Sequence, residues 1–370
     1  MGPDANTGSS RAVIVGNVPL IHTTQILQVA PTGNSDVSKE TEQVLANLGE
    51  VLIAAQSDLD SVIKLNIYLA KAEIMPQVQK TLARQFVGPI KPAASFVVGA
   101  LPETGASVAM DAVALHQTSA AISRRQSMMS KQPGSGIQKS RTLPAGPKVY
   151  VSGMADTNSL PEATQKTLEK LIACIGHLGL KKADIVQLKA FLQPMSEVAV
   201  VRKEIINFFD GAAPPVVFVE WISPAPNPPI EIELIAAGGR APTNETEPVS
   251  FLTPPGTTST KVFSRVARVN RGKLIYISGL YGEKANDAEG QVQEIFGALG
   301  DILHQTGSDF ENLVKTTYYV SDNAASDKLN EIRPQFFNPQ RPPTASKAKV
   351  SGVGRLGKTV TLDMIAVTKP

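Results

Sequence analysis

The 370-residue sequence predicts an α/β protein of the α+β type, in which one unit of strands and helices occurs three times in tandem. The first observation is an element order of strand, helix, strand, helix, strand that recurs three times along the chain. The second is an acidic residue in the last strand of each pass, Asp111, Glu233 and Asp363, at intervals of 122 and 130 positions (233 − 111 and 363 − 233). The length agrees, because domains of roughly 100–150 residues would divide this chain into two or three.

Each pass opens with a β-rich segment and continues with an amphipathic helix. Short runs of branched and aromatic residues predict strands at 20–25, 149–154 and 275–280. Apolar residues three or four positions apart then predict a helix in each pass. These apolar positions are Val44, Leu48, Val51, Leu52 and Ala55, then Leu168, Leu171, Ile172 and Ile175, and finally Val292, Ile295, Leu299, Ile302 and Leu303.

A second strand, a second helix and a final strand complete each pass. Apolar residues at every second position predict a second strand with one buried face. These strands cover 63–69, 186–192 and 314–320. The second helices end near Phe86, Phe209 and Phe337, each followed by Gly or Pro. The final strands cover 108–115, 230–236 and 360–367.

Shifts in composition mark the boundaries between the passes. Residues 118–147 are rich in Ser, Gln, Gly and basic residues, and residues 238–261 are rich in Pro, Thr and Gly, so both predict linkers or irregular lead-in segments. The division that follows is repeat 1 at 1–117, a linker or lead-in at 118–147, repeat 2 at 148–240, and repeat 3 with its lead-in at 241–370.

Composition argues against several classes of protein. A net charge of +3 is too small and too evenly spread to predict nucleic-acid binding. The single Cys174 cannot form an internal disulfide, and the four histidines lie too far apart to predict a metal site. The first residues lack the order of a signal peptide, and apolar runs such as 216–219 fall far short of the roughly 20 residues that span a bilayer. We therefore expect a cytoplasmic protein with no metal, cofactor or membrane partner.

The order of short motifs resembles the RidA/YjgF family, also called L-PSP endoribonuclease-like. The motifs are Ser152-Gly153, Ser278-Gly279, the lead-in from Pro254 to Val266, and the strand Ile230-Glu231-Ile232-Glu233-Leu234. The resemblance implies a chorismate mutase-like sheet with two helices on one face in each repeat. It also implies trimers with pockets between subunits, so three joined copies should form a monomer with an internal pseudo-trimer.

The resemblance further implies an arginine in a Pro-x-Arg-Ser/Thr segment, which deaminase members of the family use for imine hydrolysis. A guanidinium suits that task because its planar fork holds a carboxylate by two parallel hydrogen bonds. Here the arginine position is Ala94 in repeat 1, Val216 or Val217 in repeat 2, and Ala345 in repeat 3. We therefore expect ordinary imine hydrolysis to be lost.

Other site residues follow from the same resemblance. A carboxylate near the family's pocket orients the attacking water, and Asp111, Glu233 and Asp363 are the catalytic candidates for that role. The alternative is that each is a polar residue on a half-exposed strand. Backbone of the Ser-Gly turn would contact a ligand at Ser152, Gly153, Ser278 and Gly279, whereas repeat 1 has Thr24, which should block that approach.

Repeat 3 carries the densest set of polar and aromatic candidates for ligand binding. Lys347 and Lys349 fall on one strand face just after the vacant arginine position and would suit an anionic ligand, although a solvated basic face is the alternative. The other candidates are Phe263, Tyr281 and Ser346, with Arg265, Arg268, Arg341 and Arg355 nearby in the sequence.

Three functional hypotheses remain open. The first is a divergent family member that binds a small metabolite between repeats without ordinary imine deaminase activity. The second is an imine or enamine deaminase, hence a hydrolase, with a replacement anchor in repeat 3. The third is a non-catalytic scaffold. The chain also resembles the triple-repeat cyanuric acid hydrolase and barbiturase type, with Lys64 and Lys315 in matching places, but Gln187 fills that place in repeat 2.

Overall fold

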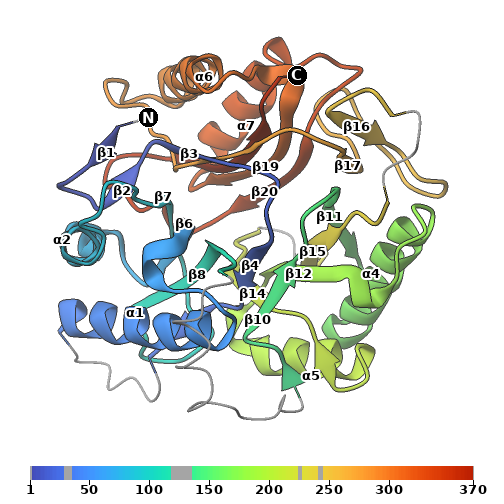
Figure 1. Ribbon diagram of the computed structural model, residues 1–370, viewed down its shortest axis with the longest axis horizontal. Helices are drawn as coiled ribbons and strands as arrows, with labels where there is room; N and C mark the ends of the chain where they lie inside the picture. Colours follow the sequence, from blue (N-terminus) through green and yellow to red (C-terminus); the bar gives the residue numbers. More distant parts are fainter. Residues whose placement is uncertain (1, 29–35, 118–135, 224–226, 241–244, 370) are drawn as a thin grey trace.

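A computed structural model describes residues 2–28, 36–117, 136–223, 227–240 and 245–369. Helices lie around the outside and strands meet in the middle of the view (Figure 1). The expected α+β class is therefore confirmed. Of the expected linker at 118–147, residues 118–135 lie outside the described part, and so do residues 241–244 of the second lead-in.

The described strands and helices form three units of the same topology. Unit 1 contains β4 (Leu20–Thr23), α1 (Val37–Ala54), β6 (Val62–Leu69), α2 (Met75–Gln85), β7 (Ala93–Val98) and β8 (Val108–Leu115). Unit 2 contains β11 (Lys148–Asp156), α4 (Leu160–Gly176), β12 (Ile185–Leu192), α5 (Val198–Phe208), β14 (Val216–Glu220) and β15 (Ile230–Ala237). Unit 3 contains β18 (Leu274–Ile277), α6 (Ala288–Gln305), β19 (Leu313–Val320), α7 (Asn323–Ile332), β20 (Thr344–Lys349) and β21 (Val360–Val367).

The strand order is the same in the three sheets. It runs β7-β6-β8-β4 in unit 1, β14-β12-β15-β11 in unit 2 and β20-β19-β21-β18 in unit 3. In each sheet the first pair is parallel and the next two pairs are antiparallel. The β-α-β-α-β order expected three times from the sequence is present in each unit, with one further strand, β7, β14 or β20, before the last.

Each sheet is extended by a strand that belongs to the next lead-in. β10 (Ser140–Leu143), which leads into unit 2, pairs with β4 of unit 1, and β17 (Val266–Val269), which leads into unit 3, pairs with β11 of unit 2. β3 (Ala12–Val15), which leads into unit 1, closes the cycle by pairing with β18 of unit 3. The three units are therefore interlocked as a ring by exchanged edge strands.

Local sequence explains where the first helix of each unit begins. Asp36 caps α1 by accepting from Ser38 N, and Asp287 caps α6 by accepting from Gly290 N, so that both satisfy helix donors that have no partner within the helix. α4 instead begins with Pro161 in its first turn, where the missing N–H costs nothing. The apolar side of each of these helices packs on its own sheet and forms the core of that unit.

The opposite face of each sheet is also buried. In β6, Leu65 and Ile67 point to the helices of unit 1, whereas Lys64 and Asn66 lie on the other face, as period-two alternation requires. That second face packs against the matching faces of the other two units, and apolar residues from all three units form shared clusters there. Charged residues of the central strands are consequently enclosed where the units meet. No helix in the described residues has the length and apolarity that crossing a membrane requires.

Candidate functional site

The Ser-Gly segments of units 2 and 3 lie at the boundaries between units. Ser278 Oγ donates to Ser10 O (2.6 Å) and accepts from Ala94 N (2.7 Å), so that it joins the end of β18 in unit 3 to two segments of unit 1. Gly279 N also donates to Ala94 O at 2.9 Å. These groups, expected to contact a ligand directly, are engaged in holding two units together.

The boundary between units 2 and 3 repeats this arrangement. Ser152 Oγ donates to Ser264 O at 2.6 Å and accepts from Ala345 N at 2.8 Å. Between units 1 and 2, Thr24 Oγ1 donates to Val216 O at 2.6 Å. Each cleft expected from the sequence therefore corresponds to a boundary at which two units are hydrogen-bonded.

Strand register settles which residue of repeat 2 fills the arginine position. Ala94 pairs with Leu65 and Ala345 pairs with Thr316, and the topologically matching pair in unit 2 joins Val216 to Leu188. Of the two alternatives left open by the sequence, Val216 is the equivalent residue. The position next to the Ser-Gly or Thr24 segment thus lacks a guanidinium in all three units.

An open cleft of about 780 Å³ lies between units 3 and 1, and we call it the open cleft. Ala94 and the Ser278–Gly279 segment form part of its wall. Its further lining is mixed in character and includes Thr7, Ser10, Arg11, Met75, Gln79, Phe96, Leu280, Tyr281, Glu283, Arg355 and Leu356. A cleft of this size is large enough for a small molecule, and its lining offers both apolar and polar contacts.

Two arginines line the open cleft, and they differ in their partners. Arg355 pairs with Glu283 and lies over the Tyr281 ring, with its guanidinium carbon 5.5 Å from the ring centroid. Arg11 is exposed, and its guanidinium has no hydrogen bond or ion pair within the described part of the chain. Arg11 is therefore the cation of this cleft that remains available to a ligand.

The equivalent boundary between units 2 and 3 is filled by two side chains. The Arg265 guanidinium donates to Gly153 O at 2.7 Å and to Ser152 O at 3.4 Å, and the residue is 8 % exposed. Glu231 lies against Gly153 so closely that a Cβ added there would come within 1.9 Å of the carboxylate. Burial, with the nearby charge of Glu233, raises the pKa of Glu231 to about 7. Ser346 Oγ accepts from Gly153 N at 3.1 Å.

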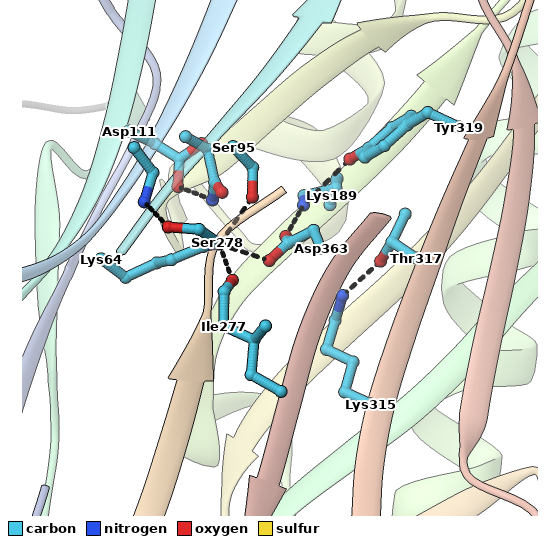
Figure 2. Close-up of polar contacts among 12 residues, drawn as sticks. Lys64, Ser95, Asp111, Lys189, Ile277, Ser278, Lys315, Thr317, Tyr319 and Asp363 are labelled. Atoms are coloured by element: carbon cyan, nitrogen blue, oxygen red, sulfur yellow. Dashed lines mark hydrogen bonds and ion pairs between the residues drawn. The ribbon is translucent and has the colours of Figure 1, made fainter. Parts of the chain in front are cut away.

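The three acidic candidates lie in the centre of the molecule and do not line the open cleft. With three lysines they form what we call the central cluster: Lys64, Lys189, Lys315, Asp111, Glu233 and Asp363. Figure 2 shows Asp363 between Lys64 and Lys189. The Asp363 carboxylate lies 3.0 Å from Lys64 Nζ and 3.2 Å from Lys189 Nζ, and Glu233 lies 2.8 Å from Lys315 Nζ. These pairs connect strands of all three units.

Hydrogen bonds engage the remaining members of the central cluster. Lys64 Nζ donates to Ser95 Oγ and to Ile277 O, both at 2.7 Å (Figure 2). Asp111 accepts from Tyr68 Oη at 2.7 Å and from Asn66 Nδ2 at 3.1 Å. Every charged group of the cluster is therefore paired, as buried charges must be.

Burial and the neighbouring charges shift the pKa values of the groups in the central cluster. Burial opposes the ionised form of Asp363, but the ammonium groups of Lys64, Lys189 and Lys315 outweigh it and hold the pKa of that carboxyl well below its ordinary value. Burial lowers the pKa of Lys64, although Asp363 acts against this. Burial also raises the pKa of the Asp111 carboxyl. Asp363 is thus stabilised as an anion by the lysines that it contacts, and it does not line the open cleft.

The remaining candidates of repeat 3 are dispersed. Lys347 Nζ donates to Ser326 Oγ at 2.8 Å and Lys349 Nζ donates to Asn323 Oδ1 at 2.9 Å, so that both lysines point toward α7. Phe263 packs against Arg265, whose guanidinium carbon lies 5.2 Å from the ring centroid. Among this group Tyr281 lines the open cleft. No group of three His, Cys, Asp or Glu suited to a metal ion occurs in the described ranges.

Arg11 was missed by reasoning from the sequence, although a signal for it exists. Ser10-Arg11 in the first lead-in matches Ser264-Arg265 in the third. The structure confirms the match, because the backbone carbonyls of Arg11 and Arg265 accept from the amides of Ser278 and Ser152, respectively. Aligning the three lead-in segments, in addition to the strands, would have identified a cation beside each of these two clefts.

The fold defines the class of protein, an α+β protein of three like units that exchange edge strands. The chain belongs to the endoribonuclease L-PSP family, which is the RidA/YjgF family that its sequence resembles, because the family model matches residues 4–116 and 257–368. The mouse 2-iminobutanoate/2-iminopropanoate deaminase is 35% identical over 115 residues, which are 29% of this chain and 82% of the mouse protein. The human protein of the same name is 33% identical over 115 residues, which are 29% of this chain and 81% of the human protein.

Solved structures of the family resemble parts of this chain. A YjgF-family member from Neisseria meningitidis has a TM-score of 0.26 and 19% identity, covering 33% of this chain and 96% of its own. A related protein from Mycobacterium tuberculosis has a TM-score of 0.25 and 20% identity, covering 32% of this chain and 99% of its own.

Proposed function

We propose that this protein binds a small metabolite with an acidic group in the open cleft, and that it does so without ordinary imine deaminase activity. The observation that carries the proposal is the presence of Arg11 in a cleft of about 780 Å³ whose usual arginine position is Ala94. A guanidinium with no protein partner can hold a carboxylate by two parallel hydrogen bonds. The lead-in arginine thus takes over the binding task of the missing strand arginine.

The arrangement of carboxylates supports binding in preference to hydrolysis. Asp111, Glu233 and Asp363 are engaged in the central cluster, away from the open cleft. Thr361 is the residue of β21 nearest to Gly279, with its Oγ1 at 3.0 Å from an added Cβ. A general base must reach the water that it activates. The two carboxylates that line the open cleft are both engaged: Asp4 accepts from Asn6 N and Thr7 Oγ1, and Glu283 is paired with Arg355. Neither lies on β21, where the family's carboxylate is expected.

A second candidate function is an imine or enamine deaminase in which another cation replaces the family's arginine. It is favoured by the names of the mouse and human relatives, both 2-iminobutanoate/2-iminopropanoate deaminases. The sequence predicted a replacement anchor in repeat 3. There Lys347 and Lys349 are bonded to α7, and Arg355, which lines the cleft, is paired with Glu283. In this candidate, Arg11 would hold the carboxylate of the imine.

Titration calorimetry with 2-oxobutanoate, a small monocarboxylate, tests the binding proposal. We expect measurable binding to the intact chain and a loss of affinity of about tenfold or more in Arg11→Gln, because a charge-assisted hydrogen bond is removed. Arg271→Gln is the matched control, since Arg271 is exposed and lies outside the open cleft. Equal affinity in the two variants, or no heat with the intact chain, would contradict the proposal.

A hydrolysis assay with 2-iminobutanoate separates the two candidates. The binding proposal expects a rate equal to that of the uncatalysed reaction. A rate well above it, lost in Arg11→Gln and retained in Arg271→Gln, would establish the deaminase instead.

A further inference from the structure

A small polar cavity of about 30 Å³ lies where the three units meet, and we call it the central cavity. It is separate from the open cleft and borders the central cluster. His22 of unit 1, Gln187 of unit 2 and Tyr276 of unit 3 contribute to its wall, together with Asn66 and Lys315. All five residues are buried. Each unit therefore contributes polar residues to one cavity.

His22 and Tyr276 occupy equivalent places in their units. Each is the third residue of the strand that follows the lead-in, and Tyr150 is the third residue of the corresponding strand in unit 2. All three side chains are enclosed. The ring nitrogens of His22 and the two tyrosine hydroxyls form no hydrogen bond of normal geometry within the described residues, although His22 faces Gln187 and the Tyr150 and Tyr276 hydroxyls face each other. Buried polar atoms are rarely left in this condition, because each forfeits the hydrogen bonds that it made with solvent.

Asn66 supplies a hydrogen-bond acceptor to the central cavity. Its Nδ2 donates to Asp111 Oδ2 at 3.1 Å, which fixes the orientation of the amide. The other amide atom, Oδ1, is buried without a protein partner. Asn66 is also a lining residue of the central cavity. The cavity thus requires an occupant that donates to the Asn66 oxygen.

We propose that the central cavity is a hydration site, in which one or two ordered water molecules join the three units by hydrogen bonds to His22, Asn66 and Tyr276. A cavity needs roughly 10–15 Å³ of space for water centres to hold one molecule, so about 30 Å³ is sufficient for one or two. The polar lining meets the second requirement, which is that a buried water finds two to four partners.

The chemistry of the lining selects water over an ion. Burial lowers the pKa of His22 to about 4, so its ring is neutral near pH 7 and offers one donor and one acceptor. Asn66 Oδ1 accepts only, whereas the Tyr276 hydroxyl can donate. A halide accepts but cannot donate to Asn66. A metal cation would meet three ammonium groups in the wall, and the two carboxylates there, Glu233 and Asp363, are already paired with these lysines. Water is the small species that satisfies donors and acceptors together.

A crystal structure of the full chain, grown in sodium bromide and measured at the bromine absorption edge, tests the proposal directly. We expect electron density for water within hydrogen-bond distance of Asn66 Oδ1, with no anomalous peak in the central cavity. An anomalous peak there would show that the site takes an anion. A cavity without density would show that it is dry, and either result would overturn the proposal.

Thermal unfolding of Tyr276→Phe gives an independent test. If the Tyr276 hydroxyl bonds to a central water, its removal should lower Tm by about 1–3 °C. In a dry cavity, removal of the Tyr276 hydroxyl would cost no more than removal of the Tyr150 hydroxyl that faces it. Tyr150→Phe is therefore the matched control, because Tyr150 is equally buried but does not line the cavity. A Tm for Tyr276→Phe at or above that of Tyr150→Phe would reject the hydration site.

Discussion

Lys64 Nζ lies 3.0 Å from Asp363 Oδ1, and this ion pair joins β6 of unit 1 to β21 of unit 3 in the centre of the molecule. The side chains are 2% and 9% exposed, so neither charge is screened by solvent as a surface pair would be. Asp363 also holds Lys189 of unit 2 at 3.2 Å. One carboxylate thus contacts lysines from two other units.

Asp363→Asn should therefore destabilise the protein strongly. The substitution leaves Lys64 and Lys189 buried without that carboxylate, and breaking a buried pair in this way costs about 3–5 kcal/mol. Urea unfolding measures the loss. The control is Glu42→Gln, because Glu42 pairs with Arg84 at the same distance of 3.0 Å but both side chains are 56% exposed, and it should cost less than about 1 kcal/mol. Similar losses in the two variants would contradict this account.

Glu231 should make stability depend on pH. Its pKa in the folded protein is about 7, above the ordinary value of 4.5, so between these values the folded carboxyl keeps a proton that the unfolded one releases. The free energy of unfolding should consequently fall as pH rises from about 4.5 to about 7, with a contribution of at most about 1.4 kcal/mol per pH unit. The difference between the pH profiles of the intact chain and Glu231→Gln measures this contribution, and parallel profiles would disprove it.

Ser278→Ala should loosen the boundary between units 3 and 1. The hydroxyl bonds to Ser10 O and Ala94 N, and its loss leaves two buried backbone groups without this partner, at a cost of about 1–3 kcal/mol. Denaturant unfolding is the measurement. Ser107→Ala serves as the control, since the Ser107 hydroxyl forms no hydrogen bond within the described residues, and it should be nearly neutral. An equally small effect at Ser278 would show that the bonds contribute little.

In solution the protein should be a monomer. The exchanged strands β3, β10 and β17 use the sheet edges of the three units within one chain, so the surfaces that join separate subunits are already occupied. Light scattering coupled to size-exclusion chromatography should give a mass near 39.3 kDa. A stable species of three chains would refute the prediction of an internal pseudo-trimer.

Most of the order of elements was predictable because it depends on local periodicity, although the predicted order did not include the strands β7, β14 and β20. The spacing of Val44, Leu48 and Leu52 predicts the buried face of α1, and these three residues are enclosed in the structure. The missing arginine was equally visible, and only the choice between Val216 and Val217 required strand register. Patterns that repeat within about ten residues were therefore sufficient to predict most of the helices and strands.

Partners distant in the sequence were not predictable in the same way. The connection between Val15 and Leu20 is short enough for a hairpin, yet the two flanking strands pair with other units. Likewise, alternation in β8 puts Asp111 on the face opposite the helices, but it does not reveal that this face meets two further sheets. Arg11 was overlooked for a related reason, since one wall of its cleft is formed by residues more than 250 positions away.

The pairing of β3 with β18 has a consequence for the order of events during synthesis. β3 leaves the ribosome more than 250 residues before β18, so its partner strand does not exist while the first two units are made. An unpaired strand is prone to join other chains, and long-range pairing is slow to form. The nascent chain must carry this exposed edge through most of translation, and closure of the ring awaits the last third of the polypeptide.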